Sequence, residues 1–144
     1  MTIQHLTYEE IQPFWQQLWP GREFEPVSAM AYLGGYHAYS PKDICYYGVI
    51  VDGNIAGVNS CHNTGDRIIR SRGLWVLPQY RGQGLGQELL SYNFTWAQEH
   101  GYHAVWSYPK QDAFNTYQSV GFTAQSDWIT DEAGNVNCYV IKFL

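Results

Sequence analysis

A glycine-rich stretch joins a predicted strand to a predicted helix; it reads Leu74-Trp75-Val76-Leu77-Pro78-Gln79-Tyr80-Arg81-Gly82-Gln83-Gly84-Leu85-Gly86. Backbone amides at a helix amino terminus have no intrahelical acceptor and carry the positive end of the helix dipole. A turn without bulky side chains lets those amides approach a phosphate or pyrophosphate closely. Gly82, Gly84 and Gly86 therefore indicate a phosphate-binding turn, and an ordinary strand-to-helix turn is the alternative.

The surroundings of these glycines exclude two better-known phosphate loops. A dinucleotide fingerprint follows the first strand of a parallel βαβ unit and needs an acidic residue about 20 residues further on. A Walker loop ends in Gly-Lys-Ser/Thr. Here the preceding strands are predicted to form hairpins, and neither continuation is present. A phosphate-binding turn here therefore belongs to another class of site, and the ordinary strand-to-helix turn stays the alternative.

The stretch resembles the acetyl-CoA motif of the GNAT N-acetyltransferases, Arg/Gln-x-x-Gly-x-Gly after a strand that ends in Val-x-Pro. Here Val76-Leu77-Pro78 precedes Arg81-Gly82-Gln83-Gly84-Leu85-Gly86. About thirty residues later, residues 113–122 resemble the Ala-x-x-x-Tyr-x-x-x-Gly-Phe segment of that family. The resemblance covers residues 47–143 well and the amino-terminal part, where the family binds its acceptor, poorly. It therefore indicates the cofactor better than the acceptor.

The resemblance implies that acetyl-CoA is the acyl donor. Amides of residues 81–87 would hold its pyrophosphate, and the main chain of residues 74–76 would pair with pantetheine and polarise the thioester carbonyl. The predicted cofactor-binding residues are Leu74, Trp75, Val76, Arg81, Gly82, Gln83, Gly84, Leu85, Gly86, Gln87 and Lys110. Arg81 has an alternative as a solvated charge, because such a loop binds phosphate mainly through its backbone.

Tyr117 matches the family tyrosine that protonates the departing thiolate, and is the predicted catalytic residue. A thiolate leaving group gains from a hydroxyl donor within hydrogen-bond reach. The alternative is a core tyrosine packed between Phe114 and Phe122. Lys110, seven residues before Tyr117, stands where the family usually has an Asn that contacts the cofactor, so this contact departs from the pattern.

No general base can be identified from the sequence. Family members often place a carboxylate on the strand before the loop or on the next strand, where this chain has Arg70 and Val105. Histidine titrates near neutrality and a water chain can carry a proton outward, so both histidines and glutamates are candidates. They are His62, His103, Glu23 and Glu25, each of which is also explained as a structural or solvent-facing residue.

The acceptor side has two notable groups of residues. Arg70 and Arg72 share a face of one predicted strand, where they would bind an anionic acceptor or form exposed ion pairs. Rings gather in the region where the family builds its acceptor pocket: Trp15, Trp19, Tyr32, Tyr36, His37 and Tyr39. Core packing explains most of them, and an aromatic cleft for an amine is the alternative.

Periodicity and turn residues predict the elements that position these groups. A short apolar segment, 3–6, precedes a helix over 8–19, for which Thr7 and Glu10 have capping-box spacing, and an apolar run predicts a second helix over 27–33. Strands follow over 44–51, 55–61 and 67–76, then a helix over 87–100, a strand over 103–108, a helix over 113–120 and a closing hairpin of 123–130 and 136–143. We expect an α/β (α+β), GNAT-like fold with a mixed, mostly antiparallel sheet of about six to seven strands, helices on both faces and the order β-αα-βββ-α-β-α-ββ.

Composition favours one domain, 1–144, in which 1–43 would bind the acceptor and 44–144 would form the acetyl-CoA-binding core. The chain is 45% hydrophobic and 15% charged, which excludes disorder. Its net charge of −5 weighs against a nucleic-acid partner, and no segment resembles a signal peptide or membrane span, so a cytoplasmic protein is expected. Cys45, Cys61 and Cys138 are best interpreted as buried free thiols, and no metal is expected.

The preferred interpretation is transfer of an acetyl group to a primary amine of a small molecule or protein. Direct attack in a ternary complex is expected, because no cysteine lies in a reactive-looking motif. A non-catalytic acyl-CoA-binding or sensing module is the alternative, suggested by the missing carboxylates and by Lys110. Acetylation of aminoacyl-tRNA would need a basic face that eight Lys and Arg barely provide. The closing hairpin could also pair with a second copy, so a homodimer is left open.

Overall fold

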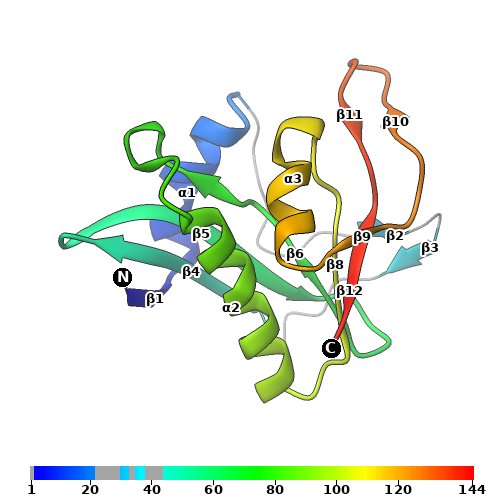
Figure 1. Ribbon diagram of the computed structural model, residues 1–144, viewed down its shortest axis with the longest axis horizontal. Coiled ribbons are helices and arrows are strands. Elements are labelled where there is room, and N and C mark those ends of the chain that lie inside the picture. Colours follow the sequence, from blue (N-terminus) through cyan, green and yellow to red (C-terminus); the bar gives the residue numbers. More distant parts are fainter. Residues whose placement is uncertain (1, 22–29, 33–34, 38–43) are drawn as a thin grey trace.

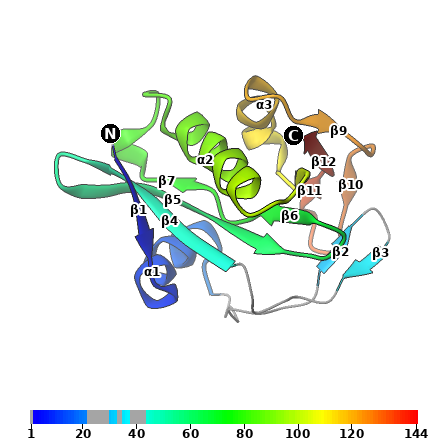
Figure 2. The same cartoon turned by 90° about the horizontal axis from the view of Figure 1, so that it is seen from below.

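The computed structural model describes residues 2–21, 30–32, 35–37 and 44–144. Its main feature is a mixed sheet of eight strands, seven of them in the order β1-β4-β5-β6-β8-β12-β9 (Figure 1). The eighth strand, β7, pairs with β5 beyond the end of β6 (Figure 2). The strands are β1 (Thr2–Leu6), β4 (Ile44–Val51), β5 (Asn54–Asn63), β6 (Ile68–Ser71), β7 (Trp75–Val76), β8 (Ala104–Ser107), β9 (Thr123–Ala124) and β12 (Val140–Phe143). Only β6 and β8 pair in parallel within this sheet.

The helices cover both faces of this sheet. Helix α1 (Tyr8–Leu18) lies on one face, and α2 (Leu85–Glu99) and α3 (Gln111–Ser119) lie on the other (Figure 2). A single 3₁₀ turn, η1 (Pro78–Tyr80), leads from β7 toward α2. The expected fold class, a mostly antiparallel mixed sheet between helices, is thereby confirmed. Among the described residues, none of the helices is both long enough and apolar enough to cross a membrane.

The predicted capping box starts α1. The Thr7 hydroxyl accepts a hydrogen bond from the Glu10 amide at 3.1 Å, and the Glu10 carboxylate accepts one from the Thr7 amide at 2.9 Å. The helix buries Ile11 and Trp15 completely against the sheet. The indole Nε1 of Trp15 donates to the main-chain oxygen of Gly73 at 3.0 Å, so α1 is anchored to the segment between β6 and β7.

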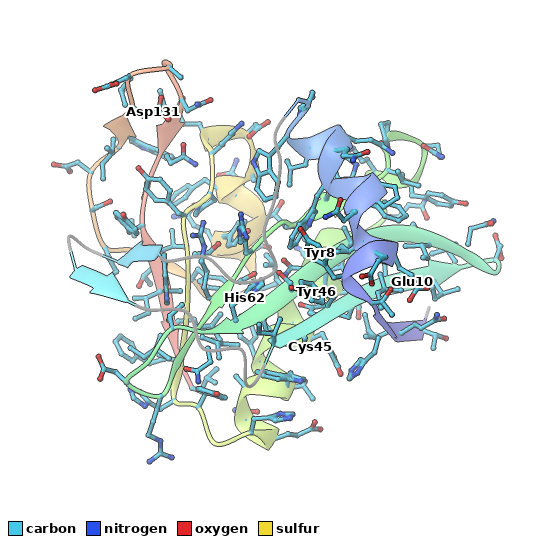
Figure 3. The ribbon with its side chains drawn as sticks, turned by 180° about the vertical axis from the view of Figure 1, so that it is seen from behind. Tyr8, Glu10, Cys45, Tyr46, His62 and Asp131 are labelled. Carbon is cyan, nitrogen blue, oxygen red and sulfur yellow. The ribbon has the colours of Figure 1, made fainter. Side chains whose placement is uncertain are left out.

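Alternation along the central strands sends side chains to two separate layers. Tyr47, Asn59 and Cys61 face α2, whereas Tyr46 and His62 face the layer that contains α1, with their ring centroids 5.8 Å apart (Figure 3). All three thiols are buried and free, as predicted. The apolar layer under α2 includes Leu85, Leu89 and Leu90.

The second predicted helix, over 27–33, is wrong where it can be tested. Met30–Tyr32 forms a short strand, β2, which pairs antiparallel with β3 (Gly35–His37). A short apolar run does not by itself distinguish a strand from a helix, and Gly35 opens the partner strand. Residues 27–29 and 33 lie outside the described part of the chain.

Two predicted strand regions are interrupted. The strand expected over 67–76 is split into β6 and β7 at Gly73, which has φ +80° and packs against Trp15 so closely that a Cβ would overlap the indole. The closing hairpin consists of two short ladders instead of one. β9 pairs with β12, and β10 (Ile129–Thr130) pairs separately with β11 (Val136–Asn137). The interruption between β6 and β7, residues 72–74, is too short for hydrophobic periodicity to reveal.

Candidate active site

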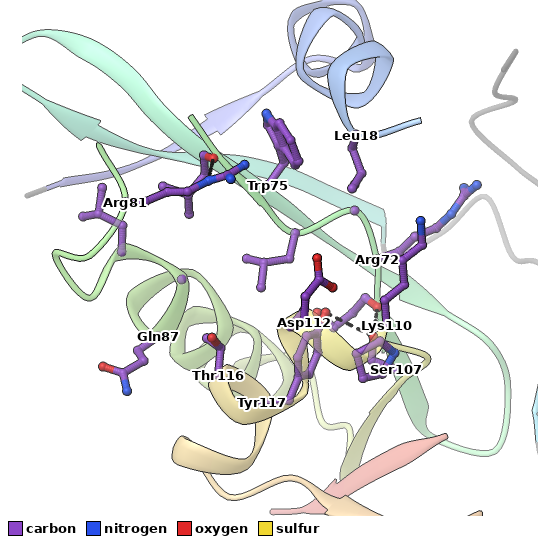
Figure 4. Close-up of a pocket in the computed structure, with 18 of the residues that line it drawn as sticks. Leu18, Arg72, Trp75, Arg81, Gln87, Ser107, Lys110, Asp112, Thr116 and Tyr117 are labelled. Atoms are coloured by element: carbon purple, nitrogen blue, oxygen red, sulfur yellow. Dashed lines mark hydrogen bonds between the residues drawn. The ribbon is translucent and has the colours of Figure 1, made fainter. Parts of the chain in front are cut away.

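A cleft of about 710 Å³ opens where β7 and β8 separate, between the amino-terminal ends of α2 and α3 (Figure 4). Eleven of the twelve predicted site residues line it: Leu74, Trp75, Val76, Arg81, Gly82, Gly84, Leu85, Gly86, Gln87, Lys110 and Tyr117. Gln83, the twelfth, is exposed in the same loop and is not part of the lining. The fold therefore brings the two sequence motifs to one place.

The glycine-rich loop leaves backbone amides free at the start of α2. Gly82 and Gly84 have φ +80°, a left-handed conformation that side chains disfavour, and Gly84 caps the helix. The first hydrogen bond of the helix runs from the Glu88 amide to the Gly84 oxygen at 3.1 Å, so the amides of residues 85–87 precede it. Gly86 has a different role, because a Cβ there would lie 3.2 Å from Thr116 of α3. Its absence of a side chain lets the two helices approach.

Strand β7 has one paired edge and one edge toward the cleft. Its partners are Gly57 and Val58 of β5, and the Leu77 amide donates to the Ala56 oxygen at 2.9 Å. Because main-chain groups alternate sides along an antiparallel strand, the peptide groups of Val76 point away from β5. This edge can accept an extended ligand as an additional strand.

The hydroxyl of Tyr117 lies at the base of the cleft, and the residue is only 4% exposed. The Ser107 hydroxyl donates to the main-chain oxygen of Ser71 at 2.7 Å and lies 3.4 Å from the Tyr117 oxygen. Burial raises the pKa of Tyr117, while the neighbouring Ser107 hydroxyl, the charge of Arg70 and the Ser71 hydroxyl lower it. The net shift is upward, so this phenol is protonated at neutral pH.

A buried polar network fixes the orientation of these hydroxyls. The side-chain amide nitrogen of Asn59 lies 2.9 Å from Ser71 Oγ, 3.2 Å from the Tyr47 oxygen and 3.1 Å from Asn93 Oδ1. A flipped Asn59 amide would set its oxygen against Asn93 Oδ1, so the nitrogen faces these acceptors. Since Ser71 Oγ accepts from Asn59, its own proton is available to Tyr117. The Tyr117 oxygen accepts from Ser71, so its own proton is left for another acceptor.

The sequence profile of the acetyltransferase (GNAT) family matches residues 5–122. The chain belongs to this family. It is accordingly an acyltransferase, as the resemblance implied. A comparison with curated protein sequences finds no significant match.

Solved GNAT structures share the fold over nearly the whole chain. A nourseothricin acetyltransferase is 17% identical with a TM-score of 0.70, covering 99% of this chain and 97% of that one. A candidate streptothricin acetyltransferase from Bacillus anthracis, in complex with acetyl coenzyme A, is 14% identical with a TM-score of 0.69 and coverages of 99% and 97%. The ribosomal-protein-S18-alanine N-acetyltransferase from Escherichia coli is 16% identical with a TM-score of 0.69 and coverages of 99% and 92%. Identities this low establish the shared fold alone.

Two of the predicted bases of this GNAT chain lie away from Tyr117. His62 is completely buried, with Nε2 2.6 Å from the Ser60 hydroxyl, and burial followed by the nearby arginines lowers its pKa well below 6.5. His103 is exposed and precedes β8, at the end opposite Ser107. Neither histidine lines the cleft. Glu23 and Glu25 lie outside the described residues.

The other wall of the GNAT cleft comes from the α1 face. Arg72 stacks on Trp15 and Trp19, with its guanidinium carbon 5.4 and 5.5 Å from their ring centroids, and Arg70 stacks on Trp106 at 5.0 Å. Arg70, Arg72 and Trp19 line the cleft, whereas Trp15 is core. The side chains of the other predicted aromatic residues lie outside the described part: Tyr32, Tyr36, His37 and Tyr39.

Sequence reasoning missed several polar residues of this site. Asp112, in the first turn of α3, is the carboxylate on the cleft wall within the described chain. Ser71 and Ser107 line the base, with Asn59 and Asn93 behind them. The sequence did contain a sign of these residues: small polar side chains occupy inward positions of otherwise apolar strands and of α2. An unpaired polar group would be costly there, so such residues indicate a buried hydrogen-bond network.

Proposed function

We propose that this chain transfers the acetyl group of acetyl-CoA to a primary amine of a small molecule or protein, by direct attack in a ternary complex. One observation carries the proposal. The protonated hydroxyl of Tyr117 lies at the base of a cleft that also contains the free amides of α2 and the free edge of β7. These three features supply an anion site, an extended-ligand site and a proton donor at one location.

The residues present fit a coenzyme A thioester. Amides of residues 82–87 would hold the pyrophosphate at the amino terminus of α2, where the helix dipole favours negative charge. The main chain of Val76 would pair with the pantetheine arm. The cleft is large enough for an extended ligand, and a structural neighbour with this fold was solved with acetyl coenzyme A.

A bound thioester would supply the acetyl group, and the coenzyme A thiolate would be the leaving group. Tyr117 would hold a proton on its oxygen and donate it toward that sulfur, while Ser71 and Ser107 keep the oxygen oriented. Amides on the β7 edge would donate to the developing negative charge on the carbonyl oxygen. The protein thus stabilises both atoms on which charge develops.

The attacking amine must lose a proton. Asp112 has its carboxylate on the cleft wall and is our candidate to accept that proton, directly or through water. His62 is excluded from direct contact because it is completely buried and does not line the cleft. The acceptor would enter along the wall that contains Arg72 and Trp19.

Thiol release from acetyl-CoA tests this function, with polyamines, amino acids, aminoglycosides, aryl amines and peptides as acceptors. We expect acceptor-dependent release that falls at least a hundredfold in Tyr117→Phe, in line with the usual contribution of a general acid. Tyr92→Phe is the matched control, since Tyr92 bonds to His5 at 2.7 Å and does not line the cleft. Tight binding of acetyl-CoA without transfer to any acceptor would instead support a binding or sensing module.

A further inference from the structure

Arg81 is directed away from the amides at the start of α2. Its Nε donates to the main-chain oxygen of Val76 at 2.9 Å, and its guanidinium carbon lies 4.6 Å from the ring centroid of Trp75. Figure 4 shows Arg81 reaching toward Trp75, with Gln87 of α2 on the other side. The side chain therefore runs from the glycine-rich loop back onto β7.

The two residues of β7 show on which side the guanidinium lies. Val76 packs into the layer under α2, whereas Trp75 packs into the layer that contains α1. A guanidinium stacked on Trp75 consequently lies toward the α1 side of the strand. The helix amides lie on the opposite side, so this arrangement separates the Arg81 charge from the predicted phosphate site.

Strand β7 has little else to fix its free edge. It is two residues long and pairs only with β5 among the described strands. Gly73 before it is held against Trp15, whereas Gly82 after it has φ +80° and open space around it, so the loop that follows β7 has a permissive backbone. The bond from Arg81 to Val76 ties the edge to the loop. It also gives the Val76 carbonyl, which points away from β5, a hydrogen-bond donor.

We propose that Arg81 is a positioning residue that holds the free edge of β7 in place for pantetheine, while phosphate is bound by the main chain of residues 82–87. The inference rests on the proposed function and gives Arg81 a different task from phosphate contact. Its consequence is measurable. Loss of the bond to Val76 should weaken binding of the pantetheine arm, whether or not a pyrophosphate is attached.

Two substitutions separate the hydrogen bond from the charge. Glutamine has its Nε2 at the same number of bonds from Cα as arginine Nε, so Arg81→Gln keeps a donor for Val76 and removes the charge. Lysine has a carbon at that position and its donors lie one bond further on, so Arg81→Lys keeps the charge and removes the donor from the position of Nε. The probes are coenzyme A and pantetheine, which lacks the pyrophosphate. Both affinities can be measured by titration calorimetry or ligand-observed NMR.

We expect Arg81→Lys to weaken both ligands by the same factor, about tenfold for one lost bond of this type, and Arg81→Gln to stay within about threefold of wild type. Arg67→Lys is the matched control. Arg67 is an exposed arginine that donates to the Gly101 oxygen at 3.1 and 2.8 Å, outside the cleft. Thermal unfolding of each variant checks that the fold is retained.

The opposite pattern overturns the inference. If Arg81→Gln weakens coenzyme A but not pantetheine, while Arg81→Lys leaves coenzyme A unchanged, the guanidinium is a phosphate ligand. If neither variant changes either affinity, Arg81 positions nothing. If the wild-type chain binds neither ligand, the proposed function fails first and this inference fails with it.

Discussion

Replacing Ser71 with alanine removes the hydroxyl between the buried Asn59 amide and Tyr117. Ser71 Oγ accepts from Asn59 at 2.9 Å, and its hydrogen bond to the phenol lowers the pKa of Tyr117. Without it, Tyr117 becomes a weaker acid. Ser71→Ala should therefore slow proton donation to the leaving thiolate.

The effect on folding should be small. Asn59 has two amide hydrogens and three acceptors nearby, so the Tyr47 hydroxyl and Asn93 Oδ1 can satisfy it after the change. The bond from Ser107 goes to the main-chain oxygen of Ser71 and survives. We expect a loss of about 1 kcal/mol of unfolding free energy, or about 3 °C in midpoint. Loss of one neutral hydrogen bond to the acid corresponds to about fivefold in kcat.

The assay is steady-state thiol release with the best acceptor, for wild type, Ser71→Ala, Tyr117→Phe and the double variant. Ser71→Ala should lower kcat about fivefold without changing the KM for acetyl-CoA, because it acts after binding. It should have no further effect when Tyr117 is already phenylalanine. The same fivefold loss in both backgrounds would refute the idea that Ser71 acts through Tyr117.

Three further predictions concern the scaffold. Gly73→Ala should lower the unfolding free energy by about 3 kcal/mol, because a Cβ would overlap Trp15 and because φ is +80° at this residue. An unchanged thermal midpoint in the variant would contradict this prediction. The free energy of unfolding should fall as pH drops below about 6.5, because burial keeps the pKa of His62 low in the folded chain while the histidine of the unfolded chain binds a proton. Urea unfolding at several pH values should show a weaker pH dependence in His62→Gln than in wild type. Burial raises the pKa of Cys45 to about 12 and also raises that of Cys61. Both thiols should therefore react with Ellman's reagent far more slowly in native than in unfolded protein. Rapid labelling of the native protein at these thiols would show that they are accessible.

Much of the fold follows from local sequence. The capping box at Thr7 starts α1, and the strand predicted over 44–51 and the helix predicted over 87–100 form as β4 and α2. The break between β6 and β7 does not follow from local patterns. It depends on the contact between Gly73 and Trp15, 58 residues apart in the chain, which only the packing of α1 against the sheet creates.

The site shows the same division. The two motifs place Tyr117 and the glycine-rich loop at one cleft, because each motif carries its own turn or helix start. Ser71, Ser107 and Asn59 meet only because β5, β6 and β8 are neighbours in the sheet. No spacing within one segment encodes that meeting. The direction of Arg81 was likewise hidden, because a motif specifies residue types and leaves the side-chain partner open.

The split between β7 and β8 also bears on the order of the reaction. It opens one cleft to both faces of the sheet, with Tyr117 on the α3 side and Arg72 on the α1 side. A donor along the β7 edge and an acceptor along the α1 wall can therefore meet without an intermediate carrier. A covalent acetyl-cysteine would need a thiol on this cleft, and all three cysteines are buried outside it. We accordingly expect mass spectrometry of the enzyme with acetyl-CoA alone to find no acetylated cysteine, and a stable adduct would refute direct attack.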